Sequence, residues 1–248
     1  MRFQNIIVKH HGRKVSGQLY FPKTNNFPVV IMSHGFNGCG NDFKDYAKIL
    51  VENDIGVCTF DFCGGSLNSK SDLSTTDMTV FTEKEDLLAV IDFVEKQQNV
   101  KSVFLFGASM GGLVSALCAE ERTDRIQGMI LLYPALCVAD DWNNRFLSVD
   151  DIPEIHQVWE VPLGKCFFET LRGFDVFEHI GKFKKDVLII HGDKDSIVPL
   201  EYSTQANKIY TNPKLQVFNG EGHGFSADGD RCVAEIIIEF VKSESRMF

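Results

Sequence analysis

The chain has 248 residues, of which 44% are hydrophobic and 24% are charged, and this composition is typical of a folded globular protein rather than a disordered one. The length suits one α/β domain with an insertion better than two independent domains. The formal net charge of −9 argues against nucleic acid and against an anionic membrane surface as partners, because both would repel the chain.

The location of the protein is predicted from its N-terminus, its apolar runs and its cysteines. Residues 1–5 lead directly into a strand-like segment and contain no secretory signal. The longest apolar stretches, such as 129–133, are far too short to span a membrane. The seven cysteines form an odd set without metal-ligand spacing, which favours a reducing compartment. We therefore expect a soluble, cytoplasmic protein without a bound metal, and a homodimer is one oligomeric state that the sequence allows.

The first half of the chain alternates strands with helices. Apolar runs and period-two patterns predict strands, and the first two of these form an antiparallel hairpin. Thr82 and Glu85 have the spacing of a capping box at the start of a helix. The predicted elements are strands 5–9, 14–21 and 27–33, helix 42–52, strand 56–60, helix 82–97, strand 102–106, helix 110–121 and strand 127–133.

This pattern is interrupted after Pro134. Residues 135–185 lack clean periodicity and are rich in aromatic and acidic side chains, so we interpret them as a cap inserted into the α/β order. Regular order then resumes with strand 186–191, helix 199–210, strand 214–218 and helix 231–241. The sequence therefore predicts a mainly parallel sheet of eight strands, with helices on both faces and an inserted cap.

The most informative stretch is the pentapeptide 107–111, Gly-Ala-Ser-Met-Gly. It lies between a buried strand and a helix rich in small residues, so Ser109 would sit on a sharp strand-to-helix turn with its hydroxyl exposed. Flanking glycines are needed because Cβ atoms there would collide with the neighbouring strand and helix. This context predicts Ser109 as a nucleophile.

A serine hydroxyl needs a base, and the base needs an orienting carboxylate. His223 is the preferred base because it lies in a glycine-flanked loop after the last predicted strand. Asp195, in the loop after strand 186–191, is the preferred acid, and Asp193 is its competitor. We predict that Asp193 instead supports the turn as an Asx-type residue. The chain order of nucleophile, acid and base is then Ser109, Asp195 and His223.

The oxyanion that forms during acyl transfer needs preorganised donors. The backbone N–H of Met110 follows the nucleophile at a helix N-terminus, and that of Phe36 lies in the loop after strand 27–33. Gly35 would let this loop approach the nucleophile closely. We expect His34 to brace the loop rather than act as a second base.

Four motifs occur in the order found in one superfamily: SHGFNG, GASMGG, HGDKDSIVP and GEGHGFS. Across nearly its whole length the chain resembles serine esterases of the α/β-hydrolase fold, and among these it is most similar to bacterial cinnamoyl (feruloyl) esterases. The resemblance implies that an acidic cap residue, by position Asp140, contacts the phenolic hydroxyl of a substrate. A solvated surface carboxylate is the alternative for Asp140.

The motifs together predict a cofactor-free carboxylic ester hydrolase that acts through an acyl-enzyme on a small-molecule ester, of the hydroxycinnamate or short-chain acyl type. A thioesterase, a monoacylglycerol lipase or a small amidase could use the same three residues. Serine at position 109 disfavours a haloalkane dehalogenase, which needs a carboxylate there, and a dienelactone hydrolase, which needs cysteine. A non-catalytic ligand-binding module of the same fold is a further alternative.

Overall fold

The computed structural model describes residues 1–245. Eight strands form one sheet in the order β1-β2-β4-β3-β5-β6-β9-β10. β2 is antiparallel to both of its neighbours, and all the strands from β4 to β10 in this order run parallel. The strands of this sheet are β1 (Arg2–His10), β2 (Arg13–Phe21), β3 (Phe27–Ser33), β4 (Gly56–Phe60), β5 (Val100–Ala108), β6 (Ile126–Leu132), β9 (Asp186–Gly192) and β10 (Asn212–Phe218).

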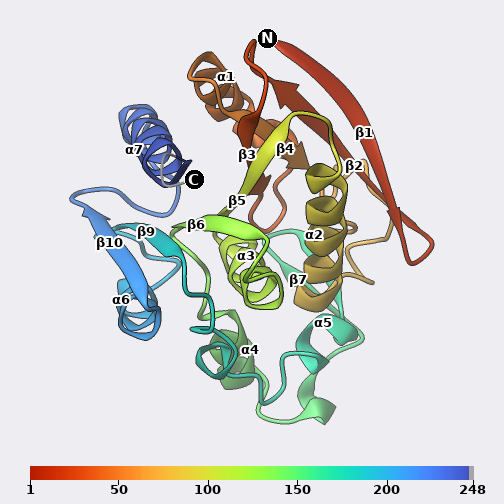
Figure 1. Ribbon diagram of the computed structural model, residues 1–248. Coiled ribbons are helices and arrows are strands. Elements are labelled where there is room, and N and C mark those ends of the chain that lie inside the picture. The colour runs from red at the N-terminus through yellow and green to blue at the C-terminus, as the bar shows by residue number, and fades with distance from the viewer. Residues whose placement is uncertain (246–248) are drawn as a thin grey trace.

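Helices cover both faces of the sheet (Figure 1). α1 and α7 contact each other on one face, and α2 and α3 contact each other on the opposite face. α6 lies on the same side as α2 and α3, because Ala206 in this helix and Tyr210 directly after it belong to the same core. The helices are α1 (Lys44–Glu52), α2 (Val80–Glu95), α3 (Met110–Glu121), α6 (Leu200–Ile209) and α7 (Ala227–Ser245), with the short helix η1 (Gly40–Phe43) before α1.

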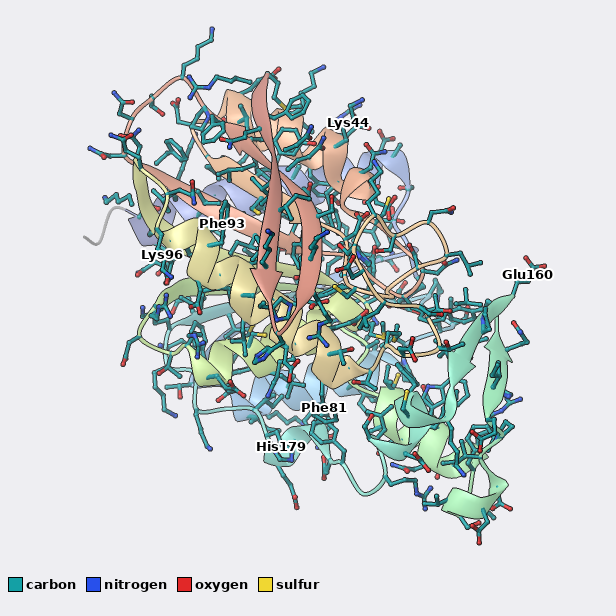
Figure 2. The ribbon with its side chains drawn as sticks, turned by 90° about the vertical axis from the view of Figure 1, so that its right-hand side faces the viewer. Lys44, Phe81, Phe93, Lys96, Glu160 and His179 are labelled. Carbon is teal, nitrogen blue, oxygen red and sulfur yellow. The ribbon has the colours of Figure 1, made fainter. Side chains whose placement is uncertain are left out.

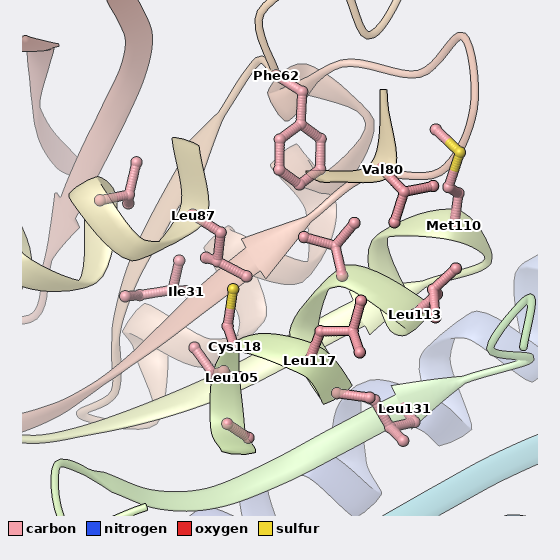
Figure 3. Packing of buried hydrophobic residues seen from close by; sticks show 14 of the residues in the cluster. Ile31, Phe62, Val80, Leu87, Leu105, Met110, Leu113, Leu117, Cys118 and Leu131 are labelled. Atoms are coloured by element: carbon pink, nitrogen blue, oxygen red, sulfur yellow. The ribbon is translucent and has the colours of Figure 1, made fainter. Parts of the chain in front are cut away.

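The central strands are apolar on both faces, as their continuous hydrophobic runs predict. In β5, Leu105 belongs to the core under α2 and α3, whereas its neighbours Phe104 and Phe106 belong to the core under α1 and α7. This alternation follows from the period of two along a strand. Figure 3 shows side chains from β3, β5, β6, α2 and α3 meeting in the first of these cores.

The predicted fold class is confirmed, and most elements lie where the sequence placed them. The start of α2 was predicted incorrectly. The helix begins at Val80 with Thr79 as its N-cap, and Thr79 and Thr82 form a reciprocal capping box, so Thr82 is the third helical residue rather than the cap. Glu85 instead bonds Arg13. α7 is longer at both ends than the predicted helix 231–241. No helix within residues 1–245 is long and apolar enough to span a membrane.

The segment between β6 and β9, predicted as the cap, contains a small antiparallel hairpin and short helices. Figure 2 shows Glu160 at the outer tip of this hairpin, away from the main sheet. The segment between β6 and β9 has an aromatic core, in which Trp142, Phe146, His156 and Phe168 are in mutual contact. The elements are α4 (Val138–Arg145), η2 (Val149–Asp151), β7 (Ile155–Val158), β8 (Val161–Gly164), α5 (Lys165–Glu169) and η3 (Val176–Glu178).

Candidate active site

Ser109 lies between the end of β5 and the start of α3, at the carboxyl edge of the parallel strands. Its backbone has φ 54° and ψ −122°, a conformation that costs a non-glycine residue about 1–3 kcal/mol. The turn is anchored because the Ser109 N–H donates to Leu132 O at 3.0 Å and Ser109 O accepts from Ala135 N at 2.9 Å. The surrounding hydrogen bonds therefore hold the serine in a strained position with its hydroxyl free to point out of the turn.

The glycines beside Ser109 are required by space. A Cβ on Gly107 would lie 2.2 Å from Gly111 O, and a Cβ on Gly111 would lie 2.3 Å from Ser33 O. Both distances are far below van der Waals contact and involve backbone atoms that cannot move aside cheaply. The reason inferred from the sequence for these glycines matches the contacts.

His223 bridges the serine and a carboxylate. Its Nε2 lies 3.0 Å from Ser109 Oγ and its Nδ1 lies 2.8 Å from Asp195 Oδ2. The other carboxylate oxygen of Asp195 accepts hydrogen bonds from the N–H groups of Ile197 and Val198, each at 2.9 Å. The loops after β9 and β10 thus bring the three residues into one hydrogen-bonded chain, in the relation that a serine nucleophile, its base and an orienting acid require.

The charge on Asp195 is stabilised by these contacts. Burial alone would raise the pKa of its carboxyl, but hydrogen bonds from Val198, His223 and Ile197 outweigh burial and hold the pKa below its usual value. The carboxyl is therefore ionised at neutral pH, as a group that accepts a hydrogen bond from Nδ1–H and stabilises the imidazolium must be.

Asp193, the competing acid, points elsewhere. Its Oδ1 accepts from Gly220 N at 2.7 Å, and its own N–H donates to Phe218 O, so it ties the loop after β9 to the end of β10. The expected Asx-type role was assigned to the wrong residue, because the bond to the N–H two residues ahead is made by Asp195. Asp195 therefore combines this turn with its contact to His223.

A second histidine supports the acid, and the sequence analysis missed it because His191 lies at the end of a strand. Its Nδ1 lies 2.7 Å from Ser203 Oγ, and its Nε2 lies 3.0 Å from Val198 O and 3.3 Å from Asp195 Oδ2. Burial lowers the pKa of His191, so the ring is neutral at pH 7. It braces the Asp195 loop.

Tyr133 is another residue without a sequence signal. It follows β6 with φ 35°, and its ring centroid lies 4.7 Å from that of His223. The ring packs against the imidazole and limits its rotation. Burial raises the pKa of the Tyr133 phenol well above its ordinary value, so it remains protonated.

Two residues that line the same cavity as Ser109, Phe36 and Met110, have backbone N–H groups without a protein acceptor in the described part of the chain. Within residues 1–245, neither the Met110 N–H nor the Phe36 N–H donates to another protein group. A Cβ on Gly35 would lie 3.0 Å from Ser109 Cβ, so glycine lets the Phe36 loop approach the serine closely. The arrangement provides two donors of the kind that stabilise an oxyanion.

His34 braces the same loop. Its Nε2 accepts from Phe62 N at 3.0 Å, and its Nδ1 lies 2.8 Å from Gly35 O, which requires a neutral ring with the proton on Nδ1. Burial lowers the pKa of His34, in agreement with the neutral form. Both ring nitrogens are occupied by backbone groups, as a bracing role requires.

A cavity of about 470 Å³ opens beside Ser109 between the sheet edge and the cap segment. Its walls include four aromatic side chains, namely Phe36, Trp142, Trp159 and Phe167. Polar side chains also line it, among them Asp141, Arg145 and His156. Within residues 1–245 no cluster of His, Cys, Asp or Glu has the arrangement of a metal site. The cavity suits a small, largely apolar molecule with a polar group.

Asp140, the predicted contact to the substrate, is exposed and does not line this cavity. Its carboxylate accepts from the Tyr202 hydroxyl at 2.6 Å, and this bond links α4 to α6. The neighbouring Asp141 lines the cavity instead. Sequence position alone could not distinguish two adjacent carboxylates, because the choice depends on how α4 is rotated.

The family of the chain follows from comparison with known proteins. The family model described as serine aminopeptidase, S33, matches residues 24–167, more than half of the chain, and the chain belongs to this family of α/β-hydrolases. A model described as TAP-like protein matches residues 170–246. Together with the fold and the sharp strand-to-helix turn at Ser109, these matches place the chain in the esterase/lipase family of α/β-hydrolases.

The similar proteins include one solved esterase structure and several curated lipases. The solved structure of Est1E from Butyrivibrio proteoclasticus with bound ferulic acid is 27% identical in sequence to this chain and superposes with a TM-score of 0.89. The match covers 97% of this chain and 99% of the Est1E chain. Monoglyceride lipase of Rattus norvegicus is 29% identical over 130 residues, which are 52% of this chain and 42% of that protein. Monoacylglycerol lipase ABHD6 of Rattus norvegicus is 21% identical over 87% of this chain and 76% of that protein. The chain thus spans less than half the length of the monoglyceride lipases that it matches.

Proposed function

We propose that the protein is a carboxylic ester hydrolase in which Ser109 is the nucleophile, His223 the general base and Asp195 the orienting acid. The observation that carries this proposal is the Oγ···Nε2 distance of 3.0 Å between Ser109 and His223, beside two free backbone N–H donors. Hydrogen-bond contact between nucleophile and base is the geometric requirement for activating a serine hydroxyl.

The reaction proceeds in two stages. Ser109 Oγ attacks the carbonyl carbon of the ester while His223 takes the hydroxyl proton, and the N–H groups of Phe36 and Met110 stabilise the oxyanion. The intermediate collapses as His223 gives the proton to the departing alcohol. Water, deprotonated by His223, then attacks the acyl-enzyme, and the carboxylic acid leaves with Ser109 restored.

The proposed substrates are esters of hydroxycinnamic acids or of short acyl chains. The aromatic walls of the cavity favour a flat ring, since aromatic side chains gain from stacked or edge contacts. The similarity to Est1E, which was solved with ferulic acid bound, supports the same class. A monoacylglycerol lipase is the second candidate, favoured by the match to monoglyceride lipases over half of this chain.

A panel of esters tests the proposal. We expect hydrolysis of p-nitrophenyl acetate and a higher kcat/KM for methyl ferulate, methyl p-coumarate and chlorogenate than for p-nitrophenyl decanoate. A fluorophosphonate probe should label the folded protein at Ser109. If 1-monooleoylglycerol is the best substrate, the lipase is correct and the hydroxycinnamate proposal is wrong. If the probe does not label the protein and no ester is hydrolysed, the remaining candidate is a non-catalytic ligand-binding module of this fold.

The two adjacent aspartates of α4 form a matched pair for substrate recognition. We expect Asp141→Asn to raise KM about 10-fold for hydroxycinnamates with a free 4-hydroxyl, because a charged acceptor strengthens that hydrogen bond by roughly 1–2 kcal/mol. KM for 4-methoxycinnamate should change less than twofold. Asp140→Asn, which affects only the bond to Tyr202, should leave both values unchanged. The opposite result would make Asp140 the contact that the resemblance implies.

A further inference from the structure

The loop that carries Phe36 is held from one side by a neighbouring turn, residues 62–65. On one flank of Phe36, the Phe62 N–H donates to His34 Nε2 at 3.0 Å. On the other flank, the Asn37 N–H donates to Gly65 O at 3.0 Å. The turn is therefore joined by hydrogen bonds to both flanks of the segment that carries the Phe36 N–H.

Two carboxyl groups of α2, one helical turn apart, lie behind this turn. Asp86 accepts from Cys63 N at 2.7 Å, so its role is explained by hydrogen bonding. Glu83 is different. Its side chain is fully buried, and neither of its carboxyl oxygens has a hydrogen-bond partner among the described residues. A buried carboxyl without a partner costs stability and is rare, so its presence calls for a reason.

Glu83 lies against the turn itself. A Cβ built on Gly65 would lie 3.2 Å from Glu83 Oε1 and 3.0 Å from His34 Cε1. Glu83 and His34 therefore close in on the same glycine, and no larger residue fits between them at position 65. Burial, with the nearby charge of Asp86 adding to it, raises the pKa of the Glu83 carboxyl well above its usual value. The side chain is a neutral acid.

We propose that Glu83 is a positioning residue for the oxyanion donor at Phe36. Its neutral side chain fills the space between α2 and the 62–65 turn, and the turn in turn fixes both flanks of the Phe36 loop. This inference rests on the proposed function. Shortening Glu83 would open space into which the turn can relax, and displacement of a donor by a fraction of an ångström weakens transition-state stabilisation more than substrate binding.

Three variants test the inference, after hydrolysis by the wild type has established the proposed function. Glu83→Ala should lower kcat for p-nitrophenyl acetate about 10-fold with KM within twofold, a fraction of the roughly 10²–10³-fold loss that follows removal of an oxyanion donor. Glu83→Asp, which keeps the acid and shortens the side chain, should lower kcat about threefold. Glu83→Gln, which has nearly the same shape and no charge, should retain the wild-type kcat.

The control is Ile91→Ala, two turns further along α2 in the same buried face. It should lower the melting temperature without lowering kcat. A trifluoromethyl ketone, whose adduct with Ser109 carries an oxyanion, should lose affinity for Glu83→Ala by the same factor as kcat. The matched methyl ketone should bind unchanged. A general loss of structure would weaken both ketones.

A pH series provides a further readout. Ionisation of Glu83 favours the unfolded chain, because its folded pKa is raised above the reference value of 4.5. The melting temperature of Glu83→Gln relative to the wild type should therefore increase as pH rises above about 4.5. The other titratable groups near Glu83 are present in both proteins; they are Asp86, whose charge acts on Glu83, and, through contacts with Asp86 or with the turn, Cys63, His34, His10 and Arg13.

Each outcome bears on one inference only. A wild type that hydrolyses no ester would overturn the proposed function. Wild-type activity together with unchanged kcat in Glu83→Ala and Glu83→Asp would overturn the positioning role and leave the proposed function intact. Should Glu83→Ala not fold, the Glu83→Asp variant and its ketone affinities decide. Equal loss of activity in Glu83→Gln and Glu83→Ala would also contradict the inference, because shape would then be irrelevant.

Discussion

Ser109→Ala should reduce kcat for every ester that the protein hydrolyses by about 10⁴- to 10⁶-fold. The change removes only Oγ, the atom that lies 3.0 Å from His223 Nε2. The oxyanion donors and the cavity remain, so substrate should still bind and a small residual rate should persist. Initial rates with p-nitrophenyl acetate, compared with a buffer blank and with active-site titration of the wild type, measure the loss.

The variant is expected to fold. Alanine is as compatible as serine with the backbone of the strand-to-helix turn, and the backbone hydrogen bonds of residue 109 do not involve the side chain. A circular dichroism spectrum and a melting temperature like those of the wild type are the control. Activity within tenfold of the wild type would contradict the role of Ser109 and direct the search to another nucleophile.

Most of the fold could be predicted from the sequence because the central strands are buried on both faces. Continuous apolar runs such as 27–33 and 102–106 are typical of strands that are covered on both faces, and each forms a strand paired on both sides. The strand-to-helix turn at Ser109 was also predictable, since the glycines around it are required by contacts with backbone. At these positions the local sequence preference and the tertiary packing favour the same structure.

The cap segment could not be predicted in the same detail. Its elements are only three to eight residues long, and they are held by contacts among aromatic rings distant in sequence. Short elements carry too few residues for a period to emerge. For the same reason the sequence could not show that Asp141 rather than Asp140 lines the cavity, or that Tyr133 packs on His223.

The second large loss of activity is expected from a change at Asp195, the proposed orienting acid. Asp195→Asn should lower kcat about 10³- to 10⁴-fold, although it changes one atom. The asparagine amide would occupy the place of Oδ2, 2.8 Å from His223 Nδ1, and would donate to that nitrogen instead of accepting from it. The ring proton would then move to Nε2, so the imidazole could no longer take the proton of Ser109. The remaining oxygen can still accept from Ile197 and Val198, which preserves the loop.

Asp193→Asn is the matched control, because the same substitution two residues away touches no atom of the hydrogen-bonded chain. Its amide oxygen can keep the bond from Gly220 N, so kcat and KM should remain within twofold of the wild type.

Rates of the two variants at pH 7 to 9 distinguish a wrong tautomer of His223 from a lost charge at position 195. A wrong tautomer stays inactive at every pH in this range, because no change in pH returns the proton to Nδ1. Recovery of the Asp195→Asn rate at high pH would show that the carboxylate supplies charge rather than orientation. A loss in Asp193→Asn equal to that in Asp195→Asn would mean that integrity of the loop after β9, and not the contact with His223, limits the reaction.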